Sequence, residues 1–216
     1  MNKGIFIVGT STDIGKTYIS GLLVKKLNEK INVGYYKPIM SGAKKISNSD
    51  VGYIKNFSNI EQNIYDMFSY SFKEAVSPHL ASKIENKSIN KNKILKDFNY
   101  LKSKYEYLIV EGCGGIICPI IYDNNNNLFL EDIIKILDLE VILVTDSNVG
   151  TINSTLLTIN YIKLHNINIK GIIFNNYKNN IICDDNIKLI KDITNIPITA
   201  IVKKNEKNIK ILNKFM

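Results

Sequence analysis

Two hydrophobic periodicities alternate along the chain. Short runs rich in Ile, Val and Tyr are typical of buried β-strands, and the segments between them carry apolar residues at helical spacing. The runs that predict strands are Gly4–Val8, Val33–Lys37, Tyr107–Glu111, Val141–Thr145, Gly171–Asn175 and Ile198–Val202. The segments that predict helices are Lys16–Lys30, Ser49–Ser58, Asn90–Lys104, Leu130–Leu137, Thr151–His165 and Asp185–Asp192. This alternation predicts successive βα units around a mostly parallel sheet.

The domain organisation is predicted to be simple. The 216 residues fit one core, and the sequence has no internal repeat or linker, so residues 1–216 are interpreted as one doubly wound α/β domain. The segment Met67–Lys87, interrupted at Ser77–His79, has the least defined pattern. The asparagine run Asn124–Asn127 predicts the tip of a surface loop.

The basic character of the chain comes from lysine alone. The net charge is +8, and all 28 basic residues are Lys. Without arginine the chain has no bidentate reader of guanine and no arginine finger, so any charge in a phosphoryl transfer must be met by lysine, metal and backbone N–H groups. The lysines are scattered among Asn and Ile, as compositional bias produces. We therefore do not expect nucleic-acid binding as the main function.

Hydropathy and cysteine content indicate the compartment. No apolar run approaches the roughly 20 residues that cross a bilayer, so no membrane span is expected. The N-terminus enters a strand and a glycine turn directly, without the features of an export signal. The three cysteines, Cys113, Cys118 and Cys183, form neither an even disulfide framework nor paired zinc half-sites. A cytoplasmic location is expected.

The strongest chemical signal is the segment from Gly9 to Thr17, GTSTDIGKT, between the first strand and the first helix. Phosphate binding needs closely approaching backbone N–H groups, a helix N-terminus, a lysine charge and a hydroxyl for Mg²⁺. Gly15, Lys16 and Thr17 supply these features. Five residues separate Gly9 from Gly15, one more than in the usual phosphate loop, so the loop is a variant. The alternative is a glycine turn with an ordinary helix start.

Two further strands end in candidate functional residues. Lys37 ends the second strand before Pro38, and Glu111 ends the third before a glycine-rich turn. In parallel sheets these ends face the ligand crevice, so both side chains are expected near the bound phosphates. A carboxylate at Glu111 can hold Mg²⁺ beside Thr17, and Asp50 belongs to Asn48–Asp50, a triplet typical of a helix N-cap. Each feature alone also has a structural explanation: a solvated lysine, a helix cap or a tight turn.

Taken together, these motifs resemble the dethiobiotin synthetase family of biotin biosynthesis. The segments that carry the resemblance occur in the family's order and at family-like separations. They are GTSTDIGKT, GYYKPIMSG, NSD, SPH, EGCGGIICP, VILVTDSNVGTIN and GIIFNN. In that family the longer phosphate loop is itself typical. The resemblance implies a P-loop NTPase-type fold and a cytoplasmic homodimeric ligase. It would use ATP, Mg²⁺ and CO₂ or bicarbonate to convert 7,8-diaminononanoate into dethiobiotin through a carbamate and a carbamic-phosphate anhydride.

The resemblance also implies roles for individual residues. The catalytic assignments are Lys16, Lys37 and Thr12. Nucleotide contacts are expected from Asp13, Ile14, Gly15, Lys16, Thr17, Tyr18, Glu111, Asn175 and Asn176, and metal contacts from Thr17, Asp50 and Glu111. Substrate contacts are expected from Thr12, Lys37, Ser41, Gly114, Gly150, Thr151 and Asn153, the last three from the neighbouring subunit. His79, His165 and Cys113 are interpreted as structural.

The base is expected to be adenine. The segment Asn175–Lys178 has no aspartate to pair with guanine, whereas Asn175 matches the family's adenine-contacting asparagine. The segment after Val202 lacks the family's proline, and no role is assigned to the lysine- and asparagine-rich C-terminus.

Three alternatives come from other classes. A partitioning or targeting P-loop switch ATPase would carry a second lysine early in the loop, where this chain has Thr10, Ser11 and Thr12. A cobyrinate-type amidoligase would normally bring a glutaminase domain, for which 216 residues leave no room. A nucleic-acid-binding protein would not need hydroxyl and carboxylate groups that converge on one metal.

Overall fold

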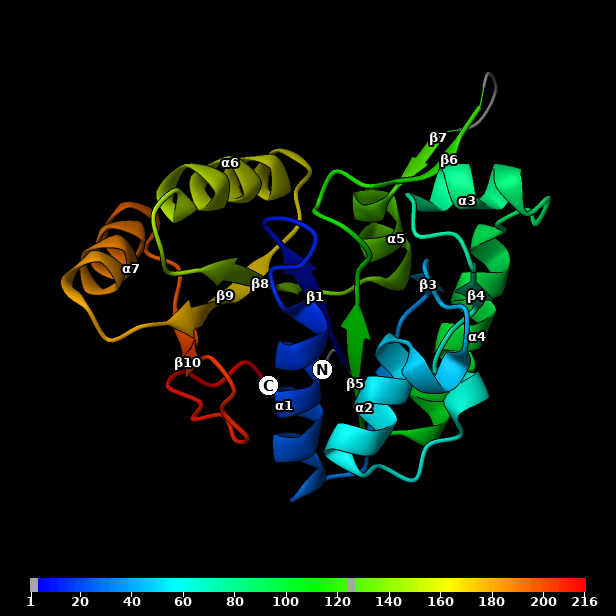
Figure 1. The fold of residues 1–216 in the computed structure, drawn as a ribbon, viewed down its shortest axis with the longest axis horizontal. Helices are drawn as coiled ribbons and strands as arrows, with labels where there is room; N and C mark the ends of the chain where they lie inside the picture. Colours follow the sequence, from blue (N-terminus) through cyan, green and yellow to red (C-terminus); the bar gives the residue numbers. More distant parts are fainter. Residues whose placement is uncertain (1–3, 124–126) are drawn as a thin grey trace.

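A computed structural model describes residues 4–123 and 127–216. Its central sheet has six parallel strands in the order β10-β9-β8-β1-β5-β2. Their bounds are β1 Gly4–Gly9, β2 Val33–Tyr36, β5 Tyr107–Glu111, β8 Val141–Asp146, β9 Ile169–Tyr177 and β10 Ile198–Lys203. The chain winds from β1 toward β2 and β5, then continues on the other side of β1 through β8 (Figure 1). This reversal beside β1 creates the crevice where doubly wound folds bind ligands.

Helices cover both faces of this sheet. They are α1 Lys16–Asn28, α2 Asp50–Ser58, α3 Pro78–Ile84, α4 Lys91–Lys104, α5 Leu130–Leu137, α6 Thr151–Leu164 and α7 Ile181–Thr194. Short elements complete the part of the chain that is described: β3 Ile39–Met40 with β4 Tyr70–Ser71, β6 Pro119–Tyr122 with β7 Asn127–Phe129, and the 3₁₀ turns Ile46–Asn48 and Ile64–Asp66. Within the described ranges no helix is long and apolar enough to span a bilayer.

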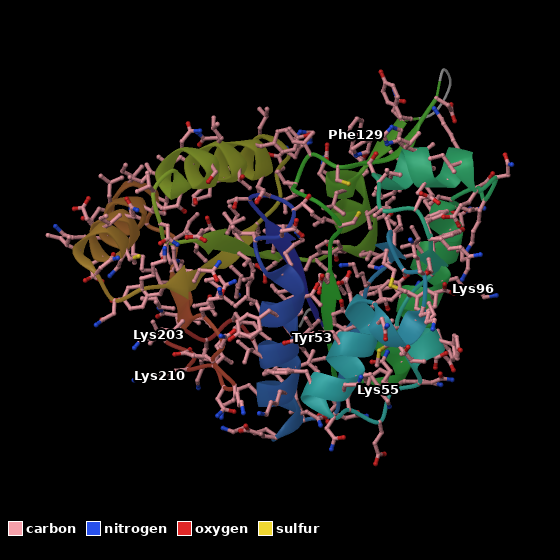
Figure 2. The ribbon with its side chains drawn as sticks, in the orientation of Figure 1. Tyr53, Lys55, Lys96, Phe129, Lys203 and Lys210 are labelled. Carbon is pink, nitrogen blue, oxygen red and sulfur yellow. The ribbon has the colours of Figure 1, made fainter. Side chains whose placement is uncertain are left out.

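The alternation of side chains along each strand separates two hydrophobic cores. On β1, Ile5 and Ile7 pack with α1 and α2, whereas Phe6 and Val8 pack with α4, α5, α6 and α7 on the opposite face. Gly21 of α1 allows a close approach of α2, because a Cβ at this position would lie 3.3 Å from the ring of Tyr53. Figure 2 labels Tyr53 where α2 meets α1. The result is the layered α/β architecture expected from the sequence.

The sequence predicted the type and order of the main elements, and the differences lie at their ends. α7 begins at Ile181, four residues before the predicted Asp185, because the N-cap Asn180 accepts a hydrogen bond from the Cys183 N–H at 2.9 Å. β2 ends at Tyr36, one residue before the predicted Lys37. The uncertain segment Met67–Lys87 contains β4 and α3. Of the predicted loop tip, Asn124–Asn126 lie outside the described residues, and Asn127 begins β7.

The C-terminal segment, residues 204–216, closes the β10 edge of the sheet and packs beside α1. The Leu212 N–H donates to the Thr199 carbonyl at 2.8 Å, and the Asn213 side chain donates to the Ile198 carbonyl at 2.7 Å. Ile209 and Phe215 are buried in the core beneath α1. Figure 2 labels Lys203 at the start of this segment and Lys210 within it. A stretch to which the sequence assigned no role is therefore structural.

Candidate active site

The loop between β1 and α1 has the geometry of a phosphate cradle. Gly15 precedes α1 with a φ of 93°, and a Cβ there would lie 2.2 Å from the Asn175 amide nitrogen, so only glycine fits. No side chain caps the N-terminus of α1, which leaves its first N–H groups for an anion. The Lys16 Nζ folds back over the loop and donates to the Ser11 carbonyl at 2.9 Å. Burial lowers the pKa of Lys16, although Glu111 opposes this effect.

Beside this loop, a buried lysine bridges two carboxylates. The Lys37 Nζ lies 2.6 Å from Glu111 Oε1 and 2.7 Å from Asp50 Oδ2. Glu111 is fully buried, and the Thr17 hydroxyl donates to the same Oε1 at 2.6 Å. Glu111 is the last residue of β5, and Lys37 directly follows β2. Thr17 lies in the first turn of α1, and Asp50 is the first residue of α2. Four segments distant in sequence therefore converge at the carboxyl edge of the sheet.

The charges in this cluster stabilise one another. Burial alone would lower the pKa of Lys37, but Glu111 and Asp50 outweigh burial and raise it above the ordinary value. Burial likewise opposes ionisation of Asp50, and the Lys37 ammonium outweighs it, so the pKa of Asp50 lies below its usual range. The folded cluster therefore holds an ammonium and an ionised Asp50 at neutral pH.

The donor set of this cluster fits a magnesium ion. A hydroxyl from Thr17 and carboxylates from Asp50 and Glu111 are hard oxygen ligands, the kind that Mg²⁺ prefers. Across residues 4–123 and 127–216, no group of three or more His, Cys, Asp or Glu forms a metal cage. Mg²⁺ sites in nucleotide enzymes typically combine one or two carboxylates with substrate phosphates and water, which agrees with this arrangement.

A pocket of about 850 Å³ joins the phosphate loop to the carboxylate cluster. The predicted site residues that line it are Thr12, Asp13, Gly15, Lys16, Thr17, Lys37, Ser41, Asp50, Glu111 and Gly114. Its remaining wall is partly apolar and comes from the start of α3 and the loop before β6, including Val76, Pro78, Ile117 and Pro119. The pocket thus combines a charged part, which holds lysines and carboxylates, with an apolar wall, and the site residues predicted from the sequence belong to the polar and charged part.

Other predicted site residues lie outside this pocket. Asn175 is buried and donates to the Ile14 carbonyl at 3.0 Å, so it braces the phosphate loop from β9, while its own side-chain oxygen has no partner. Asn176 donates to Asp146 at 3.1 Å. The Tyr18 hydroxyl donates to the Glu206 carbonyl of the C-terminal segment at 2.5 Å. Their roles toward a nucleotide stay predictions.

The start of α6 also lies outside the pocket. Gly150 adopts a φ of 91° before the helix, and the Thr151 hydroxyl donates to the Asp146 carbonyl. Asn153 is exposed, and Val149 before it is 84% exposed. Gly150, Thr151 and Asn153 are not among the described residues that line the pocket. Their substrate role, expected from a neighbouring subunit, stays a prediction.

Three contacts beside the pocket were not predicted from the sequence. The Tyr35 hydroxyl donates to Glu111 Oε2 at 2.8 Å, and no local sequence pattern indicated this contact. Cys113 and Cys118 both line the pocket with their sulfur atoms 3.7 Å apart. Cys113 also packs against the core, as expected for a structural residue. The Ser77 hydroxyl and His79 Nδ1 are 3.0 Å apart at the start of α3.

Comparison with known proteins places this geometry in a family. A family model described as an AAA domain matches residues 3–210. Among solved structures, the MinC:MinD complex of Aquifex aeolicus has a TM-score of 0.59 at 13% identity and covers 95% of this chain and 83% of that one. A ParA family ATPase from Chlorobium tepidum TLS has a TM-score of 0.57 at 16% identity, with coverage of 95% and 86%. These similarities show the P-loop α/β fold alone.

Sequence relatives are more specific. The ATP-dependent dethiobiotin synthetase BioD of Clostridium botulinum (strain Alaska E43 / Type E3) is 51% identical over 92% of this chain and 89% of the relative. The protein of the same name from Brachyspira hyodysenteriae (strain ATCC 49526 / WA1) is 45% identical over 98% of this chain and 99% of its own length. The similarity covers the phosphate loop, the lysine-carboxylate cluster and the C-terminal strands together. The chain therefore belongs to the dethiobiotin synthetase family of ATP-dependent ligases in biotin synthesis.

Proposed function

We propose that this chain, acting as one domain, carboxylates 7,8-diaminononanoate and closes its ureido ring with ATP and Mg²⁺, giving dethiobiotin, ADP and phosphate. One observation carries the proposal: Lys16, Lys37, Thr17, Asp50 and Glu111 line one pocket. The reaction brings two anions together, the carbamate of the substrate and the γ-phosphate of ATP. Their repulsion is large in a site of low dielectric, and a pocket with two lysines at its closed end offsets it.

The phosphate loop would bind the nucleotide. The open N-terminus of α1 and the Lys16 charge suit the β- and γ-phosphates, with contacts from Asp13, Ile14 and Gly15. Thr17, Asp50 and Glu111 would hold Mg²⁺, which when bound supplies positive charge to the phosphate oxygens. Asn175 and Asn176 at the end of β9, with Tyr18, are our candidates for the nucleoside side of the site.

Bond changes in the reaction need no base or nucleophile from the protein. An amine of the substrate adds CO₂, loses a proton and becomes a carbamate. The carbamate oxygen attacks the γ-phosphorus and ADP leaves. The second amine then attacks the carbonyl carbon, and phosphate leaves with the proton that this amine gives up. Thr12, Ser41 and Gly114 line the pocket where these groups would meet, and Lys37 would neutralise the carbamate. The apolar wall at Val76 and Ile117 suits the alkyl chain of the substrate.

We further propose that two copies of the chain complete each site. The substrate's carboxylate lies at the far end of its alkyl chain, away from the two amines. No side chain caps the start of α6, which suits a carboxylate, although the Thr151 N–H already donates to the Asn148 carbonyl at 3.2 Å. This helix start lies outside the pocket of its own chain. Exposed apolar residues beside it, Val149 and Leu157, suit burial against a second copy.

The proposed reaction is tested directly by product formation. Purified protein is incubated with diaminononanoate, bicarbonate, Mg²⁺ and ATP, and dethiobiotin is identified by mass. We expect ADP and dethiobiotin in equal amounts, with no product when diaminononanoate is omitted. ATP hydrolysis that proceeds equally with and without diaminononanoate, and yields no dethiobiotin, would refute the proposal.

The two lysines are expected to be essential for turnover. Lys16→Ala and Lys37→Ala should each slow the reaction by about 10² to 10³, because each removes positive charge where two anions meet. Lys37→Ala should also lower the melting temperature, since breaking a buried ion pair costs about 3–5 kcal/mol; rates are therefore compared below that temperature. Lys44→Ala, at an exposed lysine, is the control. Near-normal turnover by Lys37→Ala would make Lys37 a structural residue only.

The metal assignment predicts a changed magnesium requirement. Asp50→Asn and Glu111→Gln should each raise the Mg²⁺ concentration for half-maximal activity by roughly tenfold or more, because an anionic ligand becomes a neutral amide. Glu29→Gln, which alters a surface ion pair with Lys26, serves as the control and should titrate like the parent protein. Unchanged Mg²⁺ titrations in both site variants would contradict the assignment.

The shared site predicts complementation between subunits. Asn153→Ala should weaken diaminononanoate binding roughly tenfold, as expected for loss of a hydrogen bond to a charged group, with little effect on ATP. In a mixed dimer of Asn153→Ala and Lys37→Ala chains, one of the two sites combines an intact Lys37 with an intact Asn153. At a diaminononanoate concentration well below the KM of Asn153→Ala, the mixture should therefore gain activity over the two separate variants after subunit exchange. A mixture without this gain, or a monomer that is fully active at assay concentration, would rule out the shared site.

A further inference from the structure

The two oxygen atoms of the Glu111 carboxylate have different hydrogen-bond partners. Its Oε1 accepts hydrogen bonds from Thr17 and Lys37, both at 2.6 Å, and both of these side chains line the pocket. Its Oε2 accepts the Tyr35 hydroxyl at 2.8 Å. Tyr35 is fully buried and does not line the pocket. The carboxylate is thus held from the pocket on one side and from the protein core on the other.

Tyr35 is itself fixed at an unusual point of the sheet. Strand β2 is an edge strand, and the buried Gln62 side chain occupies the free edge at this residue. Gln62 Oε1 accepts from the Tyr35 N–H at 2.7 Å, and Gln62 Nε2 donates to the Tyr35 carbonyl at 2.9 Å. Lys55 in turn donates to the Gln62 carbonyl at 2.8 Å. The Tyr35 backbone is therefore held at both of its polar groups.

Ligand binding would change the partners of Glu111 on the pocket side only. In the proposed reaction Thr17 turns to the metal and Lys37 turns to the carbamate and phosphate, so neither remains a dedicated donor to Oε1. Tyr35 has no contact with the pocket and keeps its bond to Oε2. Carboxylates that bind metals are commonly oriented by hydrogen bonds of this kind, and losing one weakens metal binding.

We infer that Tyr35, held by Gln62, is a positioning residue that orients Glu111 toward the metal. This inference rests on the magnesium site of the proposed function. Tyr35 does not touch substrate or nucleotide and acts only through the carboxylate.

The neighbouring Tyr36 provides a matched control. It is equally buried and also has a bonded hydroxyl, 2.5 Å from Ser69 Oγ and 3.2 Å from the Ile94 carbonyl. Its side chain points to the opposite core, away from Glu111. Tyr35→Phe and Tyr36→Phe therefore remove the same atom from the same strand, and only one of them removes a donor to Glu111.

The test measures metal binding as well as turnover. Mn²⁺ is titrated into each protein in the presence of ADP, and free Mn²⁺ is followed by electron paramagnetic resonance. We expect Tyr35→Phe to weaken Mn²⁺ binding roughly tenfold and to raise the Mg²⁺ requirement of the reaction to match, with the KM for diaminononanoate unchanged. Tyr36→Phe should bind Mn²⁺ like the parent protein, whatever its effect on melting temperature.

Further variants distinguish a failure of the magnesium assignment from a failure of the positioning role of Tyr35. Glu111→Gln tests the metal site itself: if it binds Mn²⁺ normally, the magnesium assignment of the proposed function fails. If Glu111→Gln loses the metal and Tyr35→Phe retains the parent affinity, the positioning role of Tyr35 is refuted and the magnesium site stands. Should Tyr35→Phe not fold, Gln62→Met releases the Tyr35 backbone and leaves the hydroxyl in place. Parent-like Mn²⁺ affinity in Gln62→Met would then refute the inference.

Discussion

One buried ammonium organises the site of this protein. Lys37 lies between Glu111 and Asp50, and without it two carboxylates would face each other at the edge of the core. Removing a charge from water is costly, and the Lys37 ammonium outweighs this cost for Asp50, whose pKa lies below its usual range. The ends of β2 and β5 and the start of α2 are thereby held together. Lys37 thus contributes to the packing of three elements as well as to the charge of the pocket.

Because the chain has no arginine, the positive charge in this cluster is an ammonium and not a guanidinium. An ammonium is a compact charge on a flexible stem, whereas a guanidinium is a planar fork that fixes its partners in one plane. The single Lys37 nitrogen therefore bridges both carboxylates, and in the proposed function its flexible stem would let it turn toward an incoming anion. The same holds for Lys16, which rests on the Ser11 carbonyl of its own loop. Both lysines have a protein partner when no ligand is bound.

Much of this arrangement could be predicted from the sequence because the important residues stand at element ends. Glu111 and Lys37 close hydrophobic runs, and Gly15 to Thr17 open a helix, so their place at one edge follows from a parallel sheet. The role of Tyr35 could not be predicted in this way. A tyrosine within a strand looks like any core residue, and its hydroxyl contact depends on the three-dimensional register of β2 against β5.

Other features escaped prediction for similar reasons. The apolar wall of the pocket comes from Val76 and Ile117, which lie in irregular segments without hydrophobic periodicity. The early start of α7 depended on one asparagine side chain, Asn180, within a run of polar residues. The contacts of Tyr18 with the C-terminal segment join residues far apart in sequence, and no local pattern indicates them. Local sequence patterns indicated which residues carry the chemical groups of the site. Tertiary packing determined which other residues those groups contact.

The two edges of the central sheet bear on whether strands of other chains can pair with it. Gln62 fills the free edge of β2 at Tyr35, and the C-terminal segment bonds to the outer side of β10 at Thr199 and Ile198. Exposed edge strands can recruit strands from other molecules, which leads to aggregation or to sheets that continue across subunits. At these positions the backbone groups are already paired. A strand from another molecule therefore finds no free backbone partner at Tyr35 on one edge of the six-stranded sheet or at the Ile198 and Thr199 carbonyls on the other.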